Sequence, residues 1–404
     1  MIVTGKYGSA KVFAKDLEDG AREQIATLLD QDFLEGSKVR IMPDVHQGMG
    51  CVIGFTADMG DKVIPNIVGV DIGCGMLTVE LGKTDIDLPK LDRIITSSIP
   101  SGRNTHQSRA VKFGRLQDLH ICRELKDTKR LERSIGTLGG GNHFIEVGVD
   151  SGKNSYLVIH SGSRNLGTQV ARWYQNLAID LCSGKEEYFR RRDEIIESYN
   201  KEGKGKQIKA ALSLLELKYK GLKPKYPRDL CYVTGKFRDQ YLHDMKICQE
   251  YASLSREVMA DIILSNLLQR NLHDYPYFQT IHNYINFEDN IIRKGAISAY
   301  EGEKVLIPIN MRDGSILAIG KGNSDWNYSA PHGAGRVLSR TEAKKQLKLG
   351  AFKSSMRGIY SSSVHKGTLD ESPSAYKPIS EILETIGETV DVVDIIKPIY
   401  NYKA

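Results

Sequence analysis

Apolar and polar positions follow two different patterns along the chain. Residues 19–29 and about 236–269 place apolar side chains every three or four positions, which predicts two helices with one buried face each. Short runs of β-branched residues between Gly, Asp and Pro, typical of buried strands joined by tight turns, occur at 39–81, 155–161, 304–309 and 315–319. No regular strand–helix–strand alternation links these stretches, so the pattern predicts an α+β fold.

One stretch has a different texture from the rest. Residues 183–225 are strongly charged, with runs such as KEEYFRRRDEIIE and KEGKGKQIK. This pattern predicts a charged, solvent-facing helical insertion over about 183–235. No segment rich in Pro, Gly or Ser marks a domain boundary, so we expect residues 1–404 to form a single domain around this insertion.

Composition narrows the class of protein. Of the 404 residues, 40% are hydrophobic and 26% charged, which excludes a largely disordered or fibrous chain. The net charge of +6 is compatible with a polyanionic partner without requiring one. The six cysteines form no CxxC pair, and we see neither a signal peptide nor a membrane segment. We therefore expect a cytoplasmic protein with reduced thiols, and a monomer because no amphipathic seam is left over.

Several common catalytic motifs are missing. The chain has no GxxxxGK[ST] phosphate loop, no GxGxxG after a strand, no HExxH and no GxSxG. It also lacks the Lys-x-Asp-Gly motif that supplies the lysine nucleophile of common nucleotidyl-transferring ligases. Any nucleotide chemistry must therefore use another nucleophile.

A first constellation suits metal binding. Asp71 and Cys74 form a D-x-x-C unit among glycines, and His143, His160 and His282 each lie at or near the end of an apolar segment. Read alone, the D-x-x-C unit and His282 are better explained as structural residues, whereas His143 and His160 fit either role equally well, because free Cys and hydrogen-bonded His are often simply buried. Read together, the carboxylate, the thiolate and the three imidazoles could hold two divalent metals that share the thiolate.

A second constellation surrounds His332. Small neighbours in PHGAGR let a phosphate approach the imidazole, and Arg336 could neutralise that phosphate. His332 is therefore a candidate nucleophile towards phosphorus; the alternatives are a general base or part of a loop ahead of a helix. The cations that lie in or near Gly/Ser-rich stretches could together bind RNA or DNA phosphates: Arg164, Arg293, Lys294 and Arg336.

Taken in order, these strings resemble one family. MPDVHQG, GVDIGCG, GGGNHFIE, HSGSRNLG, IHN, RKGA, SAPHGAGR and SPSAYKPI are similar to the motifs of the RtcB family of RNA ligases, over about residues 41–403. The resemblance implies one α+β domain with central mixed or antiparallel sheets and surrounding helices. It also implies an enzyme that uses GTP and two Mn(II) ions to join RNA 2′,3′-cyclic phosphate or 3′-phosphate ends to 5′-hydroxyl ends, in RNA repair or tRNA splicing.

The resemblance also implies roles for individual residues. Cys74 would bridge both metals, with Asp71 and His143 on one and His160 and His282 on the other, and His332 would carry GMP covalently. The residues that would bind the nucleotide are Asn142, Glu146, His282, Asn283, Ser315, His332, Gly333, Ala334, Gly335, Arg336, Tyr376 and Lys403. Arg164 and Lys294 would bind the RNA. Asp44 and His46 would support the site or shape the RNA path.

The chain differs from the family pattern in two places, and two alternative functions stay open. Residues 310–314 differ from the Gly-Ser-Met-Gly-type loop of many members, which leaves the preference for GTP over ATP open. The insertion suggests a specialised repair role, and the need for the activating partner archease is open too. The rivals are a dinuclear metal phosphoesterase that acts on nucleic-acid ends without a nucleotide, and a nucleic-acid-binding module with a structural metal.

Overall fold

The larger of the two main sheets forms the centre of the chain. In the computed structural model, which describes residues 1–404, every pair of neighbours in this sheet is antiparallel. In spatial order its strands are β12 (Lys304–Asn310), β13 (Gly314–Gly320), β15 (Val390–Lys403), β6 (Phe144–Val149), β7 (Ser155–Ser161), β5 (Gly75–Gly82) and β8 (Tyr277–Ile281).

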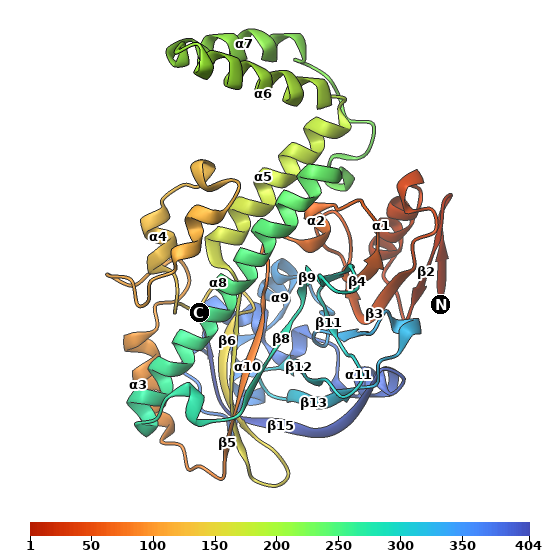
Figure 1. Cartoon of the computed structure of the whole chain (residues 1–404). Helices are drawn as coiled ribbons and strands as arrows, with labels where there is room; N and C mark the ends of the chain where they lie inside the picture. Colours follow the sequence, from red (N-terminus) through yellow and green to blue (C-terminus); the bar gives the residue numbers. More distant parts are fainter.

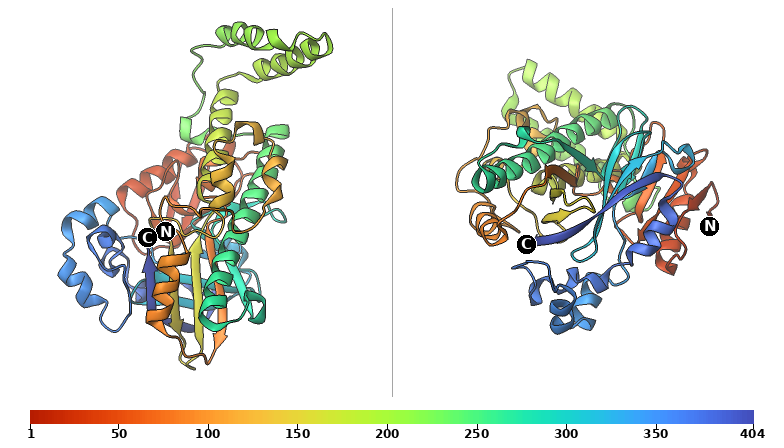
Figure 2. Two further views of the ribbon diagram at one scale, coloured as in Figure 1. Left: turned by 90° about the vertical axis from the view of Figure 1, so that its left-hand side faces the viewer. Right: turned by 90° about the horizontal axis from the view of Figure 1, so that it is seen from below.

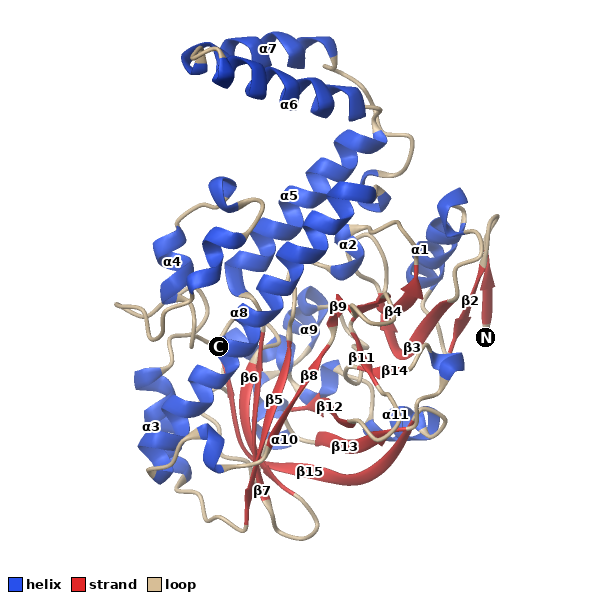
Figure 3. Ribbon diagram, viewed as in Figure 1, coloured by secondary structure: helices blue, strands red, loops and turns tan.

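The second sheet carries the N-terminal strands. Its order is β1 (Ile2–Thr4), β2 (Ser9–Val12), β3 (Val39–His46), β4 (Ile53–Asp58), β10 (Ile291–Lys294) and β9 (Asn283–Ile285). Only β2 and β3 run parallel, so this sheet is mixed. A two-stranded ribbon, β11 (Ala296–Ser298) with β14 (Ser329–Pro331), leads directly into His332. Helices and strands together confirm the α+β class (Figure 3).

One long helix covers a face of the larger sheet, and a second long helix packs beside it. α8 (Gly235–Leu268) packs on β5 and β7, and α5 (Arg164–Cys182) packs beside α8 (Figure 1). The buried side chains of α8 recur every three or four positions, so the helix presents one apolar face to the core. The remaining α-helices are α1 (Asp19–Leu29), α2 (Pro65–Val68), α3 (Leu88–Ser98), α4 (Thr128–Arg133), α6 (Glu186–Lys201), α7 (Ile208–Lys218), α9 (Arg340–Gln346), α10 (Leu349–Ser355) and α11 (Ile379–Ile386).

The far side of the sheet has its own cover. Figure 2 shows α9 and α10 on the opposite side of β15 from α8. The long strand β15 pairs with β13 along its first half and with β6 along its second half. It thereby joins the two parts of the sheet between which the candidate site lies.

The predicted elements are confirmed, but others were not predicted, among them α3, α5 and β15. The helices predicted at 19–29 and about 236–269 are α1 and α8. The stretch 39–81 forms β3, β4 and β5 but also the single-turn helix α2, which begins at Pro65. One turn of apolar residues is too short to display a helical period, so the pattern could not reveal it. No helix has both the length and the apolar run needed to cross a bilayer.

The charged insertion is helical, as predicted. It forms the hairpin of α6 and α7, which stands at the outer end of the α5–α8 pair (Figure 1). Only Phe189 and Leu215 of these two helices are buried.

Candidate active site

Antiparallel pairing brings four strand ends to one edge of the larger sheet. β6, β7, β5 and β8 are neighbours in that order, and the register pairs Phe144 with His160, His160 with Met76, and Met76 with Thr280. The starts of β5 and β6 therefore lie beside the ends of β7 and β8. At or next to these ends stand Cys74, His143, His160 and His282.

The donor atoms of these side chains converge. The Cys74 Sγ lies 3.4 Å from His143 Nε2 and 3.3 Å from His160 Nε2. His160 Nε2 is 3.4 Å from His282 Nε2, and His143 Nε2 is 3.0 Å from Asp71 Oδ2. The atoms form two groups of three that share the thiol: Asp71, Cys74 and His143, and Cys74, His160 and His282. This is the grouping that the family resemblance implied.

The protonation of the cluster fits bound cations. Burial lowers the pKa of His160 and His282 well below the ordinary value, so both imidazoles are neutral. His160 Nδ1 lies 3.2 Å from the Asn142 carbonyl oxygen, to which it can donate, so that its Nε2 lone pair faces the cluster. Burial and then Asp71 raise the pKa of Cys74, and a cation would reverse this preference. One thiolate, three imidazoles and a carboxylate suit two divalent transition metals.

A buried arginine from α8 supports the cluster. Arg256 donates to the carbonyl oxygens of Gly73 (2.9 Å) and Ser161 (2.6 Å), which lie beside Cys74 and His160 respectively. It has no exposed surface. Burial lowers its pKa to about 10, so the guanidinium remains charged at neutral pH. The sequence analysis missed this residue. Its signal was a charged side chain within the apolar stripe of a long helix.

His332 stands beside the cluster in a fixed orientation. Its ring centroid lies 4.8 Å from that of His282. Its Nδ1 is 2.7 Å from Asp44 Oδ2, and the same oxygen accepts the His332 backbone N–H at 3.1 Å. Asp44 is fully buried. With the Nδ1 proton held by this carboxylate, the Nε2 lone pair is available for chemistry.

The loop after His332 comes very close to the Asp44 backbone. Gly335 has a φ of +75°, and a Cβ at this position would lie 2.6 Å from the Asp44 carbonyl oxygen. Only glycine fits this approach without displacing the backbone. The glycine thus keeps the HGAGR loop against the strand that orients His332.

A cavity of about 210 Å³ opens next to His332. It lies between the ends of β6 and β15, the β12–β13 hairpin and the 332–336 loop. Among the residues predicted for the nucleotide, those that line it are Asn142, Glu146, Ser315, His332, Gly333, Ala334, Gly335, Arg336, Tyr376 and Lys403. The structure therefore gathers most of the predicted nucleotide residues around one space.

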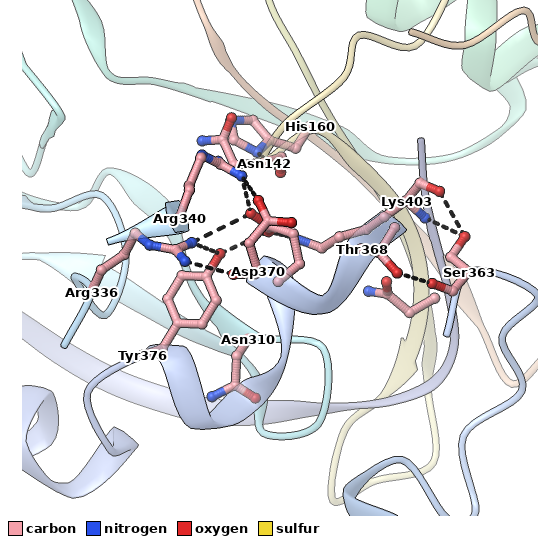
Figure 4. Close-up of polar contacts among 12 residues, drawn as sticks. Asn142, His160, Asn310, Arg336, Arg340, Ser363, Thr368, Asp370, Tyr376 and Lys403 are labelled. Atoms are coloured by element: carbon pink, nitrogen blue, oxygen red, sulfur yellow. Dashed lines mark hydrogen bonds and ion pairs between the residues drawn. The ribbon is translucent and has the colours of Figure 1, made fainter. Parts of the chain in front are cut away.

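The cations around this cavity are paired with carboxylates. Glu371 contacts Lys403 and lies 2.6 Å from Arg340, and Figure 4 shows Arg336 and Arg340 reaching towards the same acidic segment. Tyr376 donates its hydroxyl hydrogen to Glu371 at 2.7 Å. Burial would raise the pKa of Glu371, but Lys403 and Arg340 hold it at about 2. Arg340 and Glu371 were missed, although Glu371 directly precedes the SPSAYKPI motif.

Two acidic and polar groups of the cavity lack charged partners of their own. Burial raises the pKa of Glu146 to about 8, and its Oε2 accepts a hydrogen bond from Asn401 at 2.7 Å. The Ser315 hydroxyl is buried without a hydrogen-bond partner. Both are free to meet polar edges of a bound molecule.

The segment that departs from the family pattern forms part of the cavity wall. Asn310, Met311 and Gly314 line the space at the β12–β13 turn. Asn310 Oδ1 accepts the backbone N–H groups of Arg312 (3.0 Å) and Asp313 (2.9 Å), which fixes the turn. The departure therefore lies in the wall of the cavity that the predicted nucleotide residues line.

A separate polar cleft of about 440 Å³ borders the other end of the cluster. Asp71 and His143 are in its wall, together with Arg164, and no hydrophobic residue lines it. Two further arginines that were not predicted, Arg103 and Arg130, line the same cleft. None of the three arginines forms an ion pair, in contrast to the cations of the cavity.

Some predicted residues lie elsewhere. Lys294 is buried in β10 and donates to the carbonyl oxygens of Met49 and Asn66, and Arg293 beside it is fully buried against Tyr284 and Tyr300. Neither lines the cavity or the cleft. The side chain of Asn283 accepts the Gly295 N–H at 3.0 Å and so braces the chain near His282. Direct contacts of Asn283 and Lys294 with nucleotide or RNA find no support in this geometry.

Comparison with known proteins gives a consistent result. The family described as tRNA-splicing ligase RtcB matches residues 24–124 and 108–404. The RNA-splicing ligase RtcB of Escherichia coli K12 is 28% identical over 443 aligned positions, which cover 100% of this chain and 99% of that protein. The tRNA-splicing ligases RtcB of Archaeoglobus fulgidus and Thermococcus kodakarensis are each 25% identical, covering 92% and 96% of this chain and 88% and 92% of theirs. The chain belongs to the RtcB family.

Proposed function

We propose that this protein is a GTP-dependent RNA ligase that joins a 2′,3′-cyclic phosphate or 3′-phosphate RNA end to a 5′-hydroxyl end. The observation that carries the proposal is the position of His332. It is oriented by Asp44 and lies between the Cys74–histidine cluster and the cavity. Family membership and the ligase names of the relatives support it. A phosphoesterase could use the same imidazole as a general base, but it would leave the cavity and the predicted nucleotide residues that line it without a ligand.

His332 is the nucleophile in this proposal. Its Nε2 attacks the α-phosphorus of GTP, forming an N–P bond as the bond to pyrophosphate breaks. Asp44 keeps the proton on Nδ1 and stabilises the positive charge that develops on the ring. The RNA 3′-phosphate then displaces His332 and takes GMP. The 5′-hydroxyl of the second strand displaces GMP in turn and loses its proton as the phosphodiester forms.

Two divalent ions, Mn(II) by the family resemblance, would be held by Asp71, Cys74, His143, His160 and His282, with Cys74 shared. They would supply Lewis acidity towards phosphoryl oxygens and a water of lowered pKa for opening a cyclic phosphate. Arg256 and Asn142 keep the cluster residues in place through the contacts described above.

The cavity receives guanosine and its phosphate in this proposal. Glu146 and Ser315 provide polar groups without charged partners, and Tyr376 and Lys403 close the wall around Glu371. Arg336 and Gly333 lie next to His332, where the transferred phosphate would stand. The RNA end enters from the cleft, where Arg164 meets its phosphate.

The proposal extends to the whole chain. Residues 1–404 act as one cytoplasmic, monomeric ligase domain in RNA repair or tRNA splicing, and an activating protein such as archease is a candidate partner. These points rest on the family resemblance, on the cysteine usage of the sequence and, for the monomer, on the lack of a leftover amphipathic seam.

The decisive experiment is incubation with GTP labelled at the α-phosphate, in the presence of Mn(II), followed by denaturing electrophoresis. We expect an acid-labile, alkali-stable label on the protein that is absent from His332→Ala, whose metal content stays normal. Label from ATP instead of GTP would revise the nucleotide pocket. No label from either, with retained phosphatase activity on RNA ends, would favour the phosphoesterase.

A further inference from the structure

The hairpin of α6 and α7 takes no part in the candidate site. We call residues 186–225 the arm. Its two helices pack on each other, joined by the short helix η4 (Gly205–Gln207), and reach out from the end of the α5–α8 pair (Figure 1). Because only two of its helical side chains are buried, most of the arm presents its surface to solvent.

Positive charge is concentrated in the second half of the arm. Residues 202–225 hold seven lysines against two glutamates, so they carry +5 of the chain's net charge of +6. The first half is different, because the arginines of α6 are neutralised by neighbouring acids. Arg190 and Arg191 both pair with Glu187 at 2.6 Å, and Arg192 pairs with Asp193 at 2.8 Å.

Five of the lysines have no carboxylate partner. They are exposed, none forms an ion pair, and they extend from the tip of the arm to the end nearer the body: Lys206, Lys209, Lys218, Lys220 and Lys223. Unpaired ammonium groups in a row are the electrostatic requirement for holding a polyanion, because each contact releases a condensed counterion.

The base of the arm is fixed to the body. Lys225 Nζ and the Tyr226 hydroxyl each lie 2.9 Å from a carboxylate oxygen of Asp32, and Phe189 packs edge-on against Phe237 of α8. Along the chain the arm follows α5, whose first residue is Arg164 in the cleft. The 19 residues of α5 separate the cleft from the arm by roughly 28 Å at 1.5 Å per residue.

We infer that the arm binds the phosphate backbone of the RNA substrate at a distance from the break. The inference rests on the proposed ligase function. An RNA strand whose end lies in the cleft would reach the arm after roughly eight phosphates, at about 3.4 Å each. Leu214 and Leu217 are also exposed on α7, but the unpaired charge favours a polyanion over a protein partner.

The test compares two triple variants with the same change of charge. Lys218→Gln/Lys220→Gln/Lys223→Gln alters the arm. Lys83→Gln/Lys153→Gln/Lys397→Gln alters exposed, unpaired lysines of the larger sheet and its loops. Affinity for a long broken RNA hairpin is measured by filter binding across a salt series, without GTP. A second substrate of about 5 nucleotides on each side of the break is too short to span α5.

For the arm variant we expect at least about tenfold weaker binding of the long RNA. The slope of log affinity against log salt should fall by about 2 to 3, with no change for the short RNA or for guanylylation of His332. The control variant should match the parent. Unchanged long-RNA binding in the arm variant, or an equal loss in the control, would overturn the inference. Binding needs no GTP, so failure of guanylylation would instead count against the proposed function.

Discussion

The cavity and the cleft border the same metal-ligand cluster, yet they treat positive charge in opposite ways. In the cavity, Arg340 and Lys403 are held by Glu371, and Tyr376 completes this network (Figure 4). In the cleft, Arg103 and Arg130 face solvent without an acidic partner.

The difference matches what each space would receive. A pre-paired network costs little reorganisation when a guanosine binds, and it positions donors and acceptors in fixed places. Unpaired arginines attract a flexible polyanion and gain from counterion release. Under the proposed function, the two regions would therefore divide the reaction between nucleotide and RNA, with the Cys74 cluster between them.

Removing the thiol that the two groups of ligands share should affect both groups at once. Cys74→Ala takes one donor from each group of three, so metal content should fall and ligation should drop on the order of 10³-fold or more. Metal analysis and single-turnover ligation measure the two effects. Cys51→Ala, which removes a buried thiol outside the cluster, is the control. Full activity of Cys74→Ala would refute the metal assignment.

Asp44→Asn should slow guanylylation of His332 without affecting the metal-ligand cluster. The amide cannot hold the His332 Nδ1 proton as the carboxylate does, so guanylylation should slow by roughly 10²-fold or more. Metal content should stay normal, and the pH profile of guanylylation should change, which a purely structural role would not cause. An unaltered rate and profile would show that His332 needs no orientation by Asp44.

One chemical change applied to each region sharpens the comparison. Arg340→Gln should raise the KM for GTP by about tenfold and leave the KM for RNA unchanged. Arg130→Gln should do the reverse, and its effect should shrink as salt rises. Steady-state ligation at two salt concentrations measures both. A rise in the same KM in both variants would contradict the division.

The last prediction concerns stability rather than activity. With a folded pKa of about 8 against an ordinary 4.5, Glu146 binds a proton in the folded state that the unfolded chain has already lost. Between pH 4.5 and 8 this group therefore lowers the free energy of unfolding as pH rises, by up to about 1.4 kcal/mol per pH unit. Glu146→Gln should flatten that slope in urea unfolding at pH 5 to 8. An unchanged slope would show that Glu146 is ionised throughout.

The sequence predicted the residues of the Cys74 cluster better than it predicted the residues around that cluster. Asp71, Cys74 and the three histidines stand in short strings at the ends of apolar runs, so their convergence follows once neighbouring strands are antiparallel. Lys294 was expected at a phosphate because it is a cation in or near a Gly/Ser-rich stretch. It is buried instead because β10 lies between β4 and β9 inside a sheet.

Contacts between residues far apart in the sequence could not be predicted, for a different reason. Asp44 and His332 are 288 residues apart, and nothing in either string reports their contact. Arg340 and Glu371 likewise pair across 31 residues, along a path that depends on the packing of α9 and α10 against residues 366–375. Only the strand order and loop paths of the folded chain bring such residues together.

The most direct test of the division between cavity and cleft uses the Arg103→Gln/Arg130→Gln variant in two separate steps. The protein is first labelled with α-labelled GTP and then mixed with RNA carrying a 3′-phosphate. For this variant we expect labelling of His332 at the parent rate. Transfer of GMP to RNA should then be slower by roughly 10²-fold at subsaturating RNA. Loss of the labelling step, or transfer at the parent rate, would contradict this division.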